Sequence, residues 1–170
     1  MKFLIYFIFS IIILLFTSDL GYSQKVKKSS YVILTDSSSA YKIFKNKRVS
    51  TLDKKEIDEI ESMVLENVKY HNANEEIFFK KVVLNNPNSN YNKSNFFIED
   101  ITKYKRQYLA VSNDLGEKEV YVGFFCEIDA DDMDAWKEKI FIVHDGGNCF
   151  FHIKLNLTKH ICYEFFVNGY

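Results

Sequence analysis

The most regular pattern along the chain lies in residues 50–71, where apolar side chains recur every three or four positions. This spacing predicts an amphipathic helix from about Leu52 to Tyr70. Ser50, followed three residues later by Asp53, resembles a capping box at the start of such a helix. Because the helix has one apolar stripe, we expect it to lie on another layer of the protein. The stripe consists of Ile57, Ile60, Val64, Val68 and His71.

Much of the remaining chain alternates between apolar and polar residues, which is typical of strands with one buried face. Turn chemistry at Asp36–Ser39, loop composition at Leu84–Asn95 and the sequence NDLGE at 113–117 separate these segments. We therefore predict an α+β fold in which one amphipathic helix packs on an antiparallel meander sheet of four to five strands. The predicted strands are Tyr31–Thr35, Tyr41–Val49, Arg106–Ser112, Glu119–Ile128, Lys139–Asp145, Asn148–Asn156 and Ile161–Asn168.

Gly146 and Gly147 form a two-residue hairpin signal between two of these strands. Such a turn needs a positive φ angle, which glycine adopts without a Cβ clash. Asp145 and Asn148 flank the pair, and both residue types are common beside turns. We interpret the four residues as a structural turn. The alternative is a backbone clamp for a ligand, with Asp145 and Asn148 as its polar contacts.

Period two also sorts the side chains of the last three predicted strands onto two faces. The register that makes one face almost wholly apolar places His144 opposite Cys149 and Leu155 opposite Ile161. The apolar face then consists of Ile140, Ile142, His144, Cys149, Phe151, Ile153, Leu155, Ile161, Tyr163, Phe165 and Val167. The other face consists of Phe150, His152, Lys154, Cys162, Glu164 and Phe166.

The first residues predict an export signal. A basic start at Lys2 precedes an apolar run, and the small residues Gly21 and Ser23 stand before Gln24 in an A-x-A-like cleavage pattern. An uncleaved anchor is the alternative, but the apolar run is shorter than the ~20 residues that a spanning helix needs. We therefore expect a signal peptide at 1–23, a basic tail at 24–30 and a single α+β domain at 31–170, exported to the periplasm or the extracellular space.

The formal net charge of −1 argues against a general nucleic-acid binder. The charge is uneven, because residues 25–48 are mainly basic and residues 117–138 mainly acidic. We interpret both regions as solvated faces rather than as sites for a charged partner.

The chain contains three cysteines, and export would place them where one disulfide and one free thiol can coexist. In the predicted register Cys149 and Cys162 lie on opposite faces, which disfavours a bridge between them. Cys126 and Cys149 both fall on core faces. They either form a disulfide or remain two buried thiols.

The predicted proximity of His144 and Cys149 is the only feature that suggests a thiol active site. An activated thiolate usually lies at a helix N-terminus or beside fixed positive charge. Cys149 instead begins a strand among Phe and Ile residues, where burial disfavours a thiolate. We interpret it as a structural cysteine. A zinc site is not expected either, because His152 points to the opposite face and no further soft ligand has suitable spacing.

The acidic run offers a calcium candidate, because Glu127, Asp129, Asp131 and Glu138 have the one, three, five and twelve spacing of a calcium-binding loop. The sixth position is Asp132, where that loop requires glycine. We favour the alternative that Asp131 or Asp132 caps a short helical turn carrying Trp136.

The sequence W136…VHDGGNCFFHIK…NL…FFVNG169, preceded by YKRQY at 104–108 and LDKKEIDEIE at 52–61, resembles a family of small exported bacterial proteins of unknown function. The resemblance covers about the last two-thirds of the chain. It implies a helix beside a C-terminal antiparallel meander and an exported location, but no reaction. By fold-level analogy the arrangement is also similar to that of cystatins. Gln107, however, is followed by Tyr-Leu-Ala-Val without the glycine of the inhibitory cystatin hairpin.

These features predict an exported, non-catalytic binding or interaction module whose partner is an unknown extracytoplasmic protein or ligand. We expect no cofactor, no nucleic-acid partner and no membrane association after signal cleavage. The alternative is a thiol-dependent hydrolase or transferase that uses Cys149 and His144.

Overall fold

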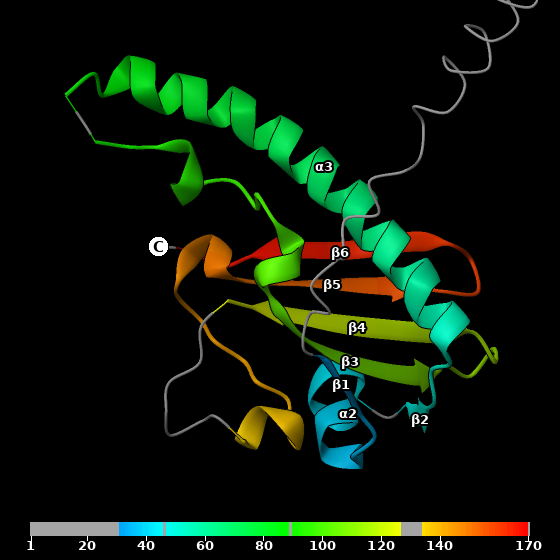
Figure 1. Ribbon diagram of the computed structural model, residues 1–170. Coiled ribbons are helices and arrows are strands. Elements are labelled where there is room, and N and C mark those ends of the chain that lie inside the picture. Colours follow the sequence, from blue (N-terminus) through cyan, green and yellow to red (C-terminus); the bar gives the residue numbers. More distant parts are fainter. Residues whose placement is uncertain (1–30, 46, 89, 127–133, 170) are drawn as a thin grey trace, which may run out of the picture.

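The structure is a computed structural model that describes residues 31–45, 47–88, 90–126 and 134–169 (Figure 1). The predicted signal peptide and basic tail lie outside these residues. One long helix crosses a face of a six-stranded sheet, so the α+β class is confirmed. The main elements are β1 (Tyr31–Leu34), α2 (Ser37–Phe44), β2 (Arg48–Ser50), α3 (Lys54–Asn85), β3 (Lys105–Ser112), β4 (Lys118–Phe125), β5 (Phe150–Asn156) and β6 (Ile161–Val167), with 3-10 turns at Lys93–Asn95, Ile101–Lys103, Ala135–Lys137 and Gly147–Cys149.

The sheet is mixed, whereas a purely antiparallel sheet of four to five strands was predicted. Its strands lie in the order β1-β3-β4-β5-β6, and the neighbours from β3 to β6 are antiparallel. β1 is parallel to β3 along residues 106–109, and β2 pairs antiparallel with residues 110–112. The two short strands therefore share one edge of β3, end to end. Their partner lies more than fifty residues away along the chain, so no local pattern announces the pairing.

The predicted strand Tyr41–Val49 is largely wrong, because its first four residues belong to α2 and only its end, at Arg48 and Val49, lies in a strand, β2. Asp36 accepts a hydrogen bond from the backbone N–H of Ser39 at 2.7 Å and caps the helix. Ala40 and Phe44, one helical turn apart, are buried against the sheet. The serines at 37–39 indicated a turn rather than a helix, because serine favours caps and turns over helix interiors.

The helix α3 begins as predicted but extends fifteen residues further, to Asn85. Its capping box uses Asp53 and Glu56 rather than Ser50 and Asp53, with the Asp53 carboxylate accepting from the Glu56 N–H at 2.8 Å. The predicted stripe from Ile57 to Val68 is buried. Of the helices that the structure describes, none has the length and the apolar composition needed to cross a membrane.

Both faces of the sheet carry buried clusters. The main core lies between α3 and the sheet and contains the predicted strand residues Val120, Val122 and Phe124. A second cluster on the outer face joins α2 to β3 and β4. One covered face was predicted, but Tyr121 and Phe125, which point outward from β4, are also apolar and buried.

The predicted strand Lys139–Asp145 and its Gly-Gly hairpin are also wrong, since β5 pairs with β4 and β6 instead. Side chains, rather than a neighbouring strand, form hydrogen bonds to the backbone N–H and C=O groups of residues 136–145. Gln107, fully buried, donates to the carbonyls of Trp136 and Lys139 and accepts from the N–H of Phe141. Asn168 donates to the carbonyls of Val143 and Asp145 at 2.7 and 2.9 Å. The segment therefore crosses the outer face as a tethered loop.

The β5–β6 pair forms as predicted, but its register differs. Phe151 lies opposite Val167, two residues from the predicted partner, and a bulge follows Lys154. The bulge turns Cys162 toward the main core, although it was predicted on the other face. Tyr163 turns outward and donates to Glu119 at 2.9 Å. One extra residue in a strand reverses the faces that follow it, which is why the sorting failed at this end.

Candidate binding site

The predicted thiol pair is not assembled in the structure. Cys149 forms a disulfide bond with Cys126, with the two Cα atoms 5.1 Å apart. His144 is exposed on the tethered loop and faces no cysteine across a strand pair. While the disulfide is intact, Cys149 has no thiol with which to act as a nucleophile. Cys162 is the free cysteine of the described chain, and burial raises the pKa of its thiol.

The four residues of the predicted turn form a bend that leads into β5. Gly146 and Gly147 have φ angles of 91° and 57°, so the requirement for glycine is real although the hairpin is not. Asp145 accepts from the N–H of Gly146. Asn148 donates to the carbonyls of Ser94 and Phe97, and so connects this bend to the segment after α3.

The calcium candidate cannot be placed as a set. Glu127, Asp129 and Asp131 lie outside the described residues, and Glu138 follows the predicted helical turn, in which Trp136 is buried. Across the described ranges, no group of three or more His, Cys, Asp or Glu side chains is arranged to hold a metal ion.

The outer face of β5 and β6 carries a polar cluster at the predicted positions His152, Lys154 and Glu164. The Glu164 carboxylate lies 2.8 Å from His152 Nε2 and 2.9 Å from Lys154 Nζ. Burial alone would raise the pKa of Glu164, but these two partners outweigh it and lower the pKa. The His152 ring stacks between Tyr121 and Phe166. Each charged group already has its partner, so this cluster stabilises the strand pair.

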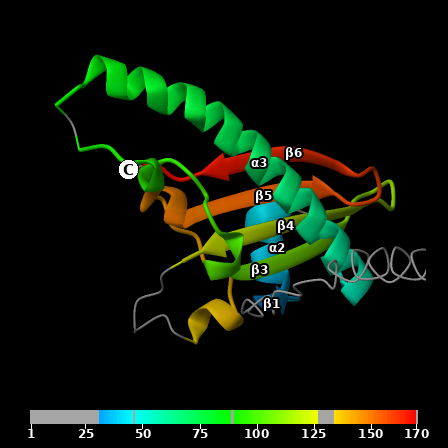
Figure 2. The ribbon, with the colours of Figure 1, turned by 45° about the horizontal axis from the view of Figure 1, so that its top comes forward.

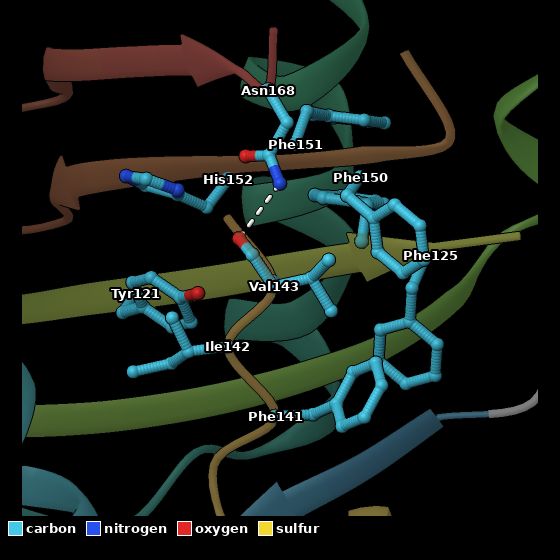
Figure 3. Close-up of a pocket in the computed structure, with 11 residues that line it drawn as sticks. Tyr121, Phe125, Phe141, Ile142, Val143, Phe150, Phe151, His152 and Asn168 are labelled. Atoms are coloured by element: carbon cyan, nitrogen blue, oxygen red, sulfur yellow. Dashed lines mark hydrogen bonds between the residues drawn. The ribbon is translucent and has the colours of Figure 1, made fainter. Parts of the chain in front are cut away.

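A small pocket lies on the same face, between the tethered loop and β4–β5 (Figure 3). Phe125, Phe141 and Phe150 crowd one end of it, and the Asn168–Val143 hydrogen bond crosses another. Its volume is about 30 Å³, which is close to the volume of one water molecule in the liquid. It cannot hold an organic ligand.

A larger groove lies on the opposite face, between α3 and β6, with a volume of about 370 Å³. The C-terminal half of α3 extends beyond the sheet at β6, and the chain after it returns beneath the helix (Figures 1 and 2). Two hydrogen bonds tether the returning chain to α3: the Asn72 side-chain amide donates to the Ile98 carbonyl and accepts from the Ile98 N–H. The residues that line it include His71, Glu75, Phe78, Phe96, Phe165 and Val167.

The helix side of the groove continues the stripe that builds the core. His71, Glu75 and Phe78 follow Val68 at intervals of three or four residues, so they lie on the same side of α3. The His71 ring packs on Phe165, with 5.2 Å between centroids. Phe78 packs on Phe96 at 6.1 Å, yet 53% of its surface is exposed. The core of the protein therefore ends in an incompletely covered aromatic surface.

The other side of the groove is an open strand edge. Among the described strands, β5 alone pairs with β6. The N–H of Asn168 donates to the carbonyl of Phe150, and hydrogen-bonded and non-bonded pairs alternate along antiparallel strands. By this alternation Phe165 and Val167 direct their backbone N–H and C=O groups away from β5. Their side chains pack against the main core, and no strand of the described chain pairs with their outward backbone groups.

The electrostatics of the groove depend on two residues. Glu75 is half-buried, and no Lys or Arg of the described chain forms an ion pair with it, whereas the neighbouring Glu76 pairs with Lys93. Burial lowers the pKa of His71, and the nearby Glu75 and a backbone hydrogen bond to Phe96 only partly oppose this. His71 is therefore neutral near pH 7. The groove carries the single negative charge of Glu75.

Comparison with known proteins supplies no relative for this site: no protein-family model, no curated protein and no solved structure matches the chain.

The groove was not predicted from the sequence. His71 was predicted in the helical stripe, but the helix was predicted to end at Tyr70, before Glu75 and Phe78. The signal that would have found them is the same spacing continued for two more turns, with polar residues between.

Proposed function

We propose that this protein is an exported, non-catalytic binding module and that an extended segment of a partner protein occupies the groove between α3 and β6. The observation that carries the proposal is the open edge of β6 beneath a half-exposed aromatic face of α3. An extended peptide can add to such an edge through main-chain hydrogen bonds, while the groove receives alternate side chains.

The geometry matches this occupant. A peptide paired with Phe165 and Val167 would direct alternate side chains toward the helix, because side chains alternate across a strand. Phe78 and Phe96 would cover an apolar side chain of that peptide. Aromatic residues of this kind contribute a large part of the binding energy at protein interfaces.

Two features support export. The predicted signal peptide at 1–23 is the first. The disulfide between Cys126 and Cys149 is the second, because such bonds persist in the periplasm and outside the cell and are rare in the cytosol. The resemblance to small exported bacterial proteins of unknown function agrees with both features and remains a prediction.

The test is a selection of short random peptides, displayed on phage, against the purified protein. We expect enrichment of peptides with alternating apolar residues. Their binding should weaken about tenfold in Phe78→Ala, a loss of about 1.4 kcal/mol. Leu84→Ala is the matched control, because Leu84 is 79% exposed on the same helix and does not line the groove. It should change the affinity less than about twofold.

Amide hydrogen exchange gives a second measurement. A bound peptide should slow exchange at Phe165 and Val167, whose N–H groups face the open edge, and leave that at Phe166 little changed. Equal loss of affinity in Phe78→Ala and Leu84→Ala, or the absence of any enriched peptide, would contradict the proposed function.

A further inference from the structure

The side of α3 that faces away from the sheet is apolar and exposed along its second half. Tyr70, Ile77 and Leu84 are each more than half exposed. They recur every seven residues, which is about two turns of helix, so they form one stripe. Ile77 follows the buried Val68 by about two and a half turns, which places the stripe on the side opposite the core. Tyr70, Ile77 and Leu84 are called the outer stripe below.

The outer stripe is separate from the groove. Phe78 directly follows Ile77, and because each residue turns the helix by about 100°, the two side chains leave α3 in different directions. Phe78 packs on Phe96 of the returning chain. Figures 1 and 2 show the second half of α3 projecting beyond β6, with the described elements near it on its sheet side. A partner on the outer stripe would therefore not occupy the groove.

Lysines flank the outer stripe. Lys80 and Lys81 precede Leu84 by four and three residues, so they lie on either side of it, and both are exposed. Lys81 forms no ion pair with any described residue, and the pair between Lys80 and Glu76 is open at 3.5 Å. From residue 77 to residue 98 the chain contains three lysines and no acidic residue. The projecting part of the molecule is therefore apolar and basic.

The same side of α3 has a different character in the first half of the helix. Glu66 precedes Leu84 by about five full turns, so it points in the same direction, and it is exposed. The outward side thus changes from polar and acidic before Tyr70 to apolar and basic after it. Only the projecting half suits an apolar contact with a negatively charged partner.

An exposed apolar stripe flanked by lysines is typical of helices that lie in a membrane interface. The apolar side chains enter the boundary between head groups and acyl chains. The lysine stems accompany them, while the ammonium groups remain beside anionic head groups. A tyrosine such as Tyr70 suits the same boundary, because its ring is apolar and its hydroxyl is polar. A second copy of α3 fits less well, since the outer stripe covers fewer than the about three to four heptads of a coiled coil.

We propose that the outer stripe is a membrane-docking surface, which binds peripherally to a lipid surface that carries anionic head groups. The proposal goes beyond the proposed function and does not rest on it. No membrane association was predicted from the sequence, in which the helix was predicted to end at Tyr70. The continuation of α3 to Asn85 creates this surface.

Binding to lipid vesicles tests the proposal. The protein is used without the predicted signal peptide, whose own apolar run would bind lipid. We expect co-sedimentation with vesicles that contain about one third phosphatidylglycerol to be at least about tenfold stronger than with vesicles of phosphatidylcholine alone. Raising the salt from about 0.1 M to about 1 M should remove most of this difference, because it screens the lysines.

The apolar contribution is tested at Leu84. Leu84→Ser should weaken binding to the anionic vesicles about fivefold or more, because the leucine side chain no longer enters the lipid. Leu115→Ser is the matched control, since Leu115 is exposed to the same extent, 79%, in the turn between β3 and β4. That turn lies far from the C-terminal end of α3 (Figure 1). Leu115→Ser should change vesicle binding less than about twofold.

The charge contribution is tested at Lys81. Lys81→Gln should weaken binding to the anionic vesicles about fivefold and leave binding to neutral vesicles almost unchanged. Lys55→Gln is the control, an exposed lysine at the start of the same helix, and should have less than about a twofold effect. Circular dichroism should show that all four variants are folded, because each changed side chain is exposed.

Three outcomes would overturn the proposal. One is the absence of binding to the anionic vesicles. Another is equal binding by Leu84→Ser and Leu115→Ser, which is the result expected if only the basic tail at 24–30 bound the lipid. The third is a dimer in analytical ultracentrifugation that Leu84→Ser dissociates, which would assign the outer stripe to a second copy. Peptide binding in the groove should persist in Leu84→Ser, so the two proposals can fail separately.

Discussion

The two halves of α3 have the same backbone geometry and opposite surroundings. Over residues 57–68 the helix lies on the sheet, and its stripe is at most 9% exposed. Beyond Tyr70 the helix passes the edge of the sheet, and large apolar side chains such as Ile77 and Phe78 are more than half exposed. The first half supplies stability. The second half, held by hydrogen bonds to the returning chain, has apolar side chains that the described residues leave partly uncovered.

The largest expected effect separates the two halves directly. Ile60→Asp places a carboxylate at a position with 0% exposure. The lost burial of the isoleucine and the desolvation of the acid should together cost more than about 4 kcal/mol, so soluble folded protein should be absent. Ile77→Asp makes the same change at 58% exposure and should cost about 0.5 kcal/mol. Circular dichroism with urea denaturation measures both. Equal costs would mean that the comparison between the halves is wrong.

The next largest effect concerns the disulfide between Cys126 and Cys149, which are 23 residues apart. Replacing both by serine should lower the free energy of unfolding by about 3 kcal/mol, because the unfolded chain regains the freedom of that loop. Amides in residues 57–68, which exchange through global unfolding, should then exchange about a hundredfold faster.

The half of α3 beyond Tyr70 provides the internal control for that measurement. Amides beyond residue 72 exchange by local opening, so we expect their rates to change little. Similar acceleration in both halves would show that α3 opens only as one unit.

A smaller effect tests the hydrogen bonds that tether α3 to the returning chain at Ile98. Asn72→Ala removes both hydrogen bonds to Ile98, whose backbone is buried, and should cost about 1–3 kcal/mol. It should also speed amide exchange in residues 73–85. Asn67→Ala is the control, because among the described residues its amide donates to the Met63 carbonyl of the same helix and not to the returning chain. If Asn67→Ala sped amide exchange in residues 73–85 as much as Asn72→Ala, the hydrogen bonds to Ile98 would not be what orders this part of the helix.

The smallest effect is a dependence on pH. Hydrogen bonds from Lys159, Asn113 and Asn156 lower the pKa of Glu117 to about 2. Its folded pKa is thus below the ordinary value of 4.5, so its contribution is complete above about pH 4.5 and is lost as the pH falls toward 2. The difference in denaturant midpoint between the wild type and Glu117→Gln should narrow over this range. A constant difference would contradict the assignment.

Glu76 allows the corresponding test on the half of α3 beyond Tyr70. Its hydrogen bond from Lys93 lowers its pKa as well. The pair is exposed, so Glu76→Gln should leave the global midpoint almost unchanged. Any effect should appear as faster amide exchange near residue 76. A large decrease in the denaturant midpoint would show that the half of α3 beyond Tyr70 contributes to global stability.

The sequence by itself determined the parts of this protein that depend on local periodicity. The stripe from Ile57 to Val68 is visible because a helix repeats every 3.6 residues and one face must leave water. The strands β3 to β6 are visible for the equivalent reason, with period two. The need for glycine at Gly146 and Gly147 was also correct, because backbone conformation at a bend is a local property.

Only the tertiary structure decided what lies next to what. Gln107 and Asn168, distant in sequence, bind the backbone of residues 136–145 and prevent a strand there. The bulge in the last strand pair reverses the side of Cys162, and the shared edge of β3 makes the sheet mixed. The groove arises for the same reason: the stripe continues through His71, Glu75 and Phe78, but the sheet beneath it ends at β6. A repeating pattern states which side of an element avoids water, and it carries no information on where the covering layer stops.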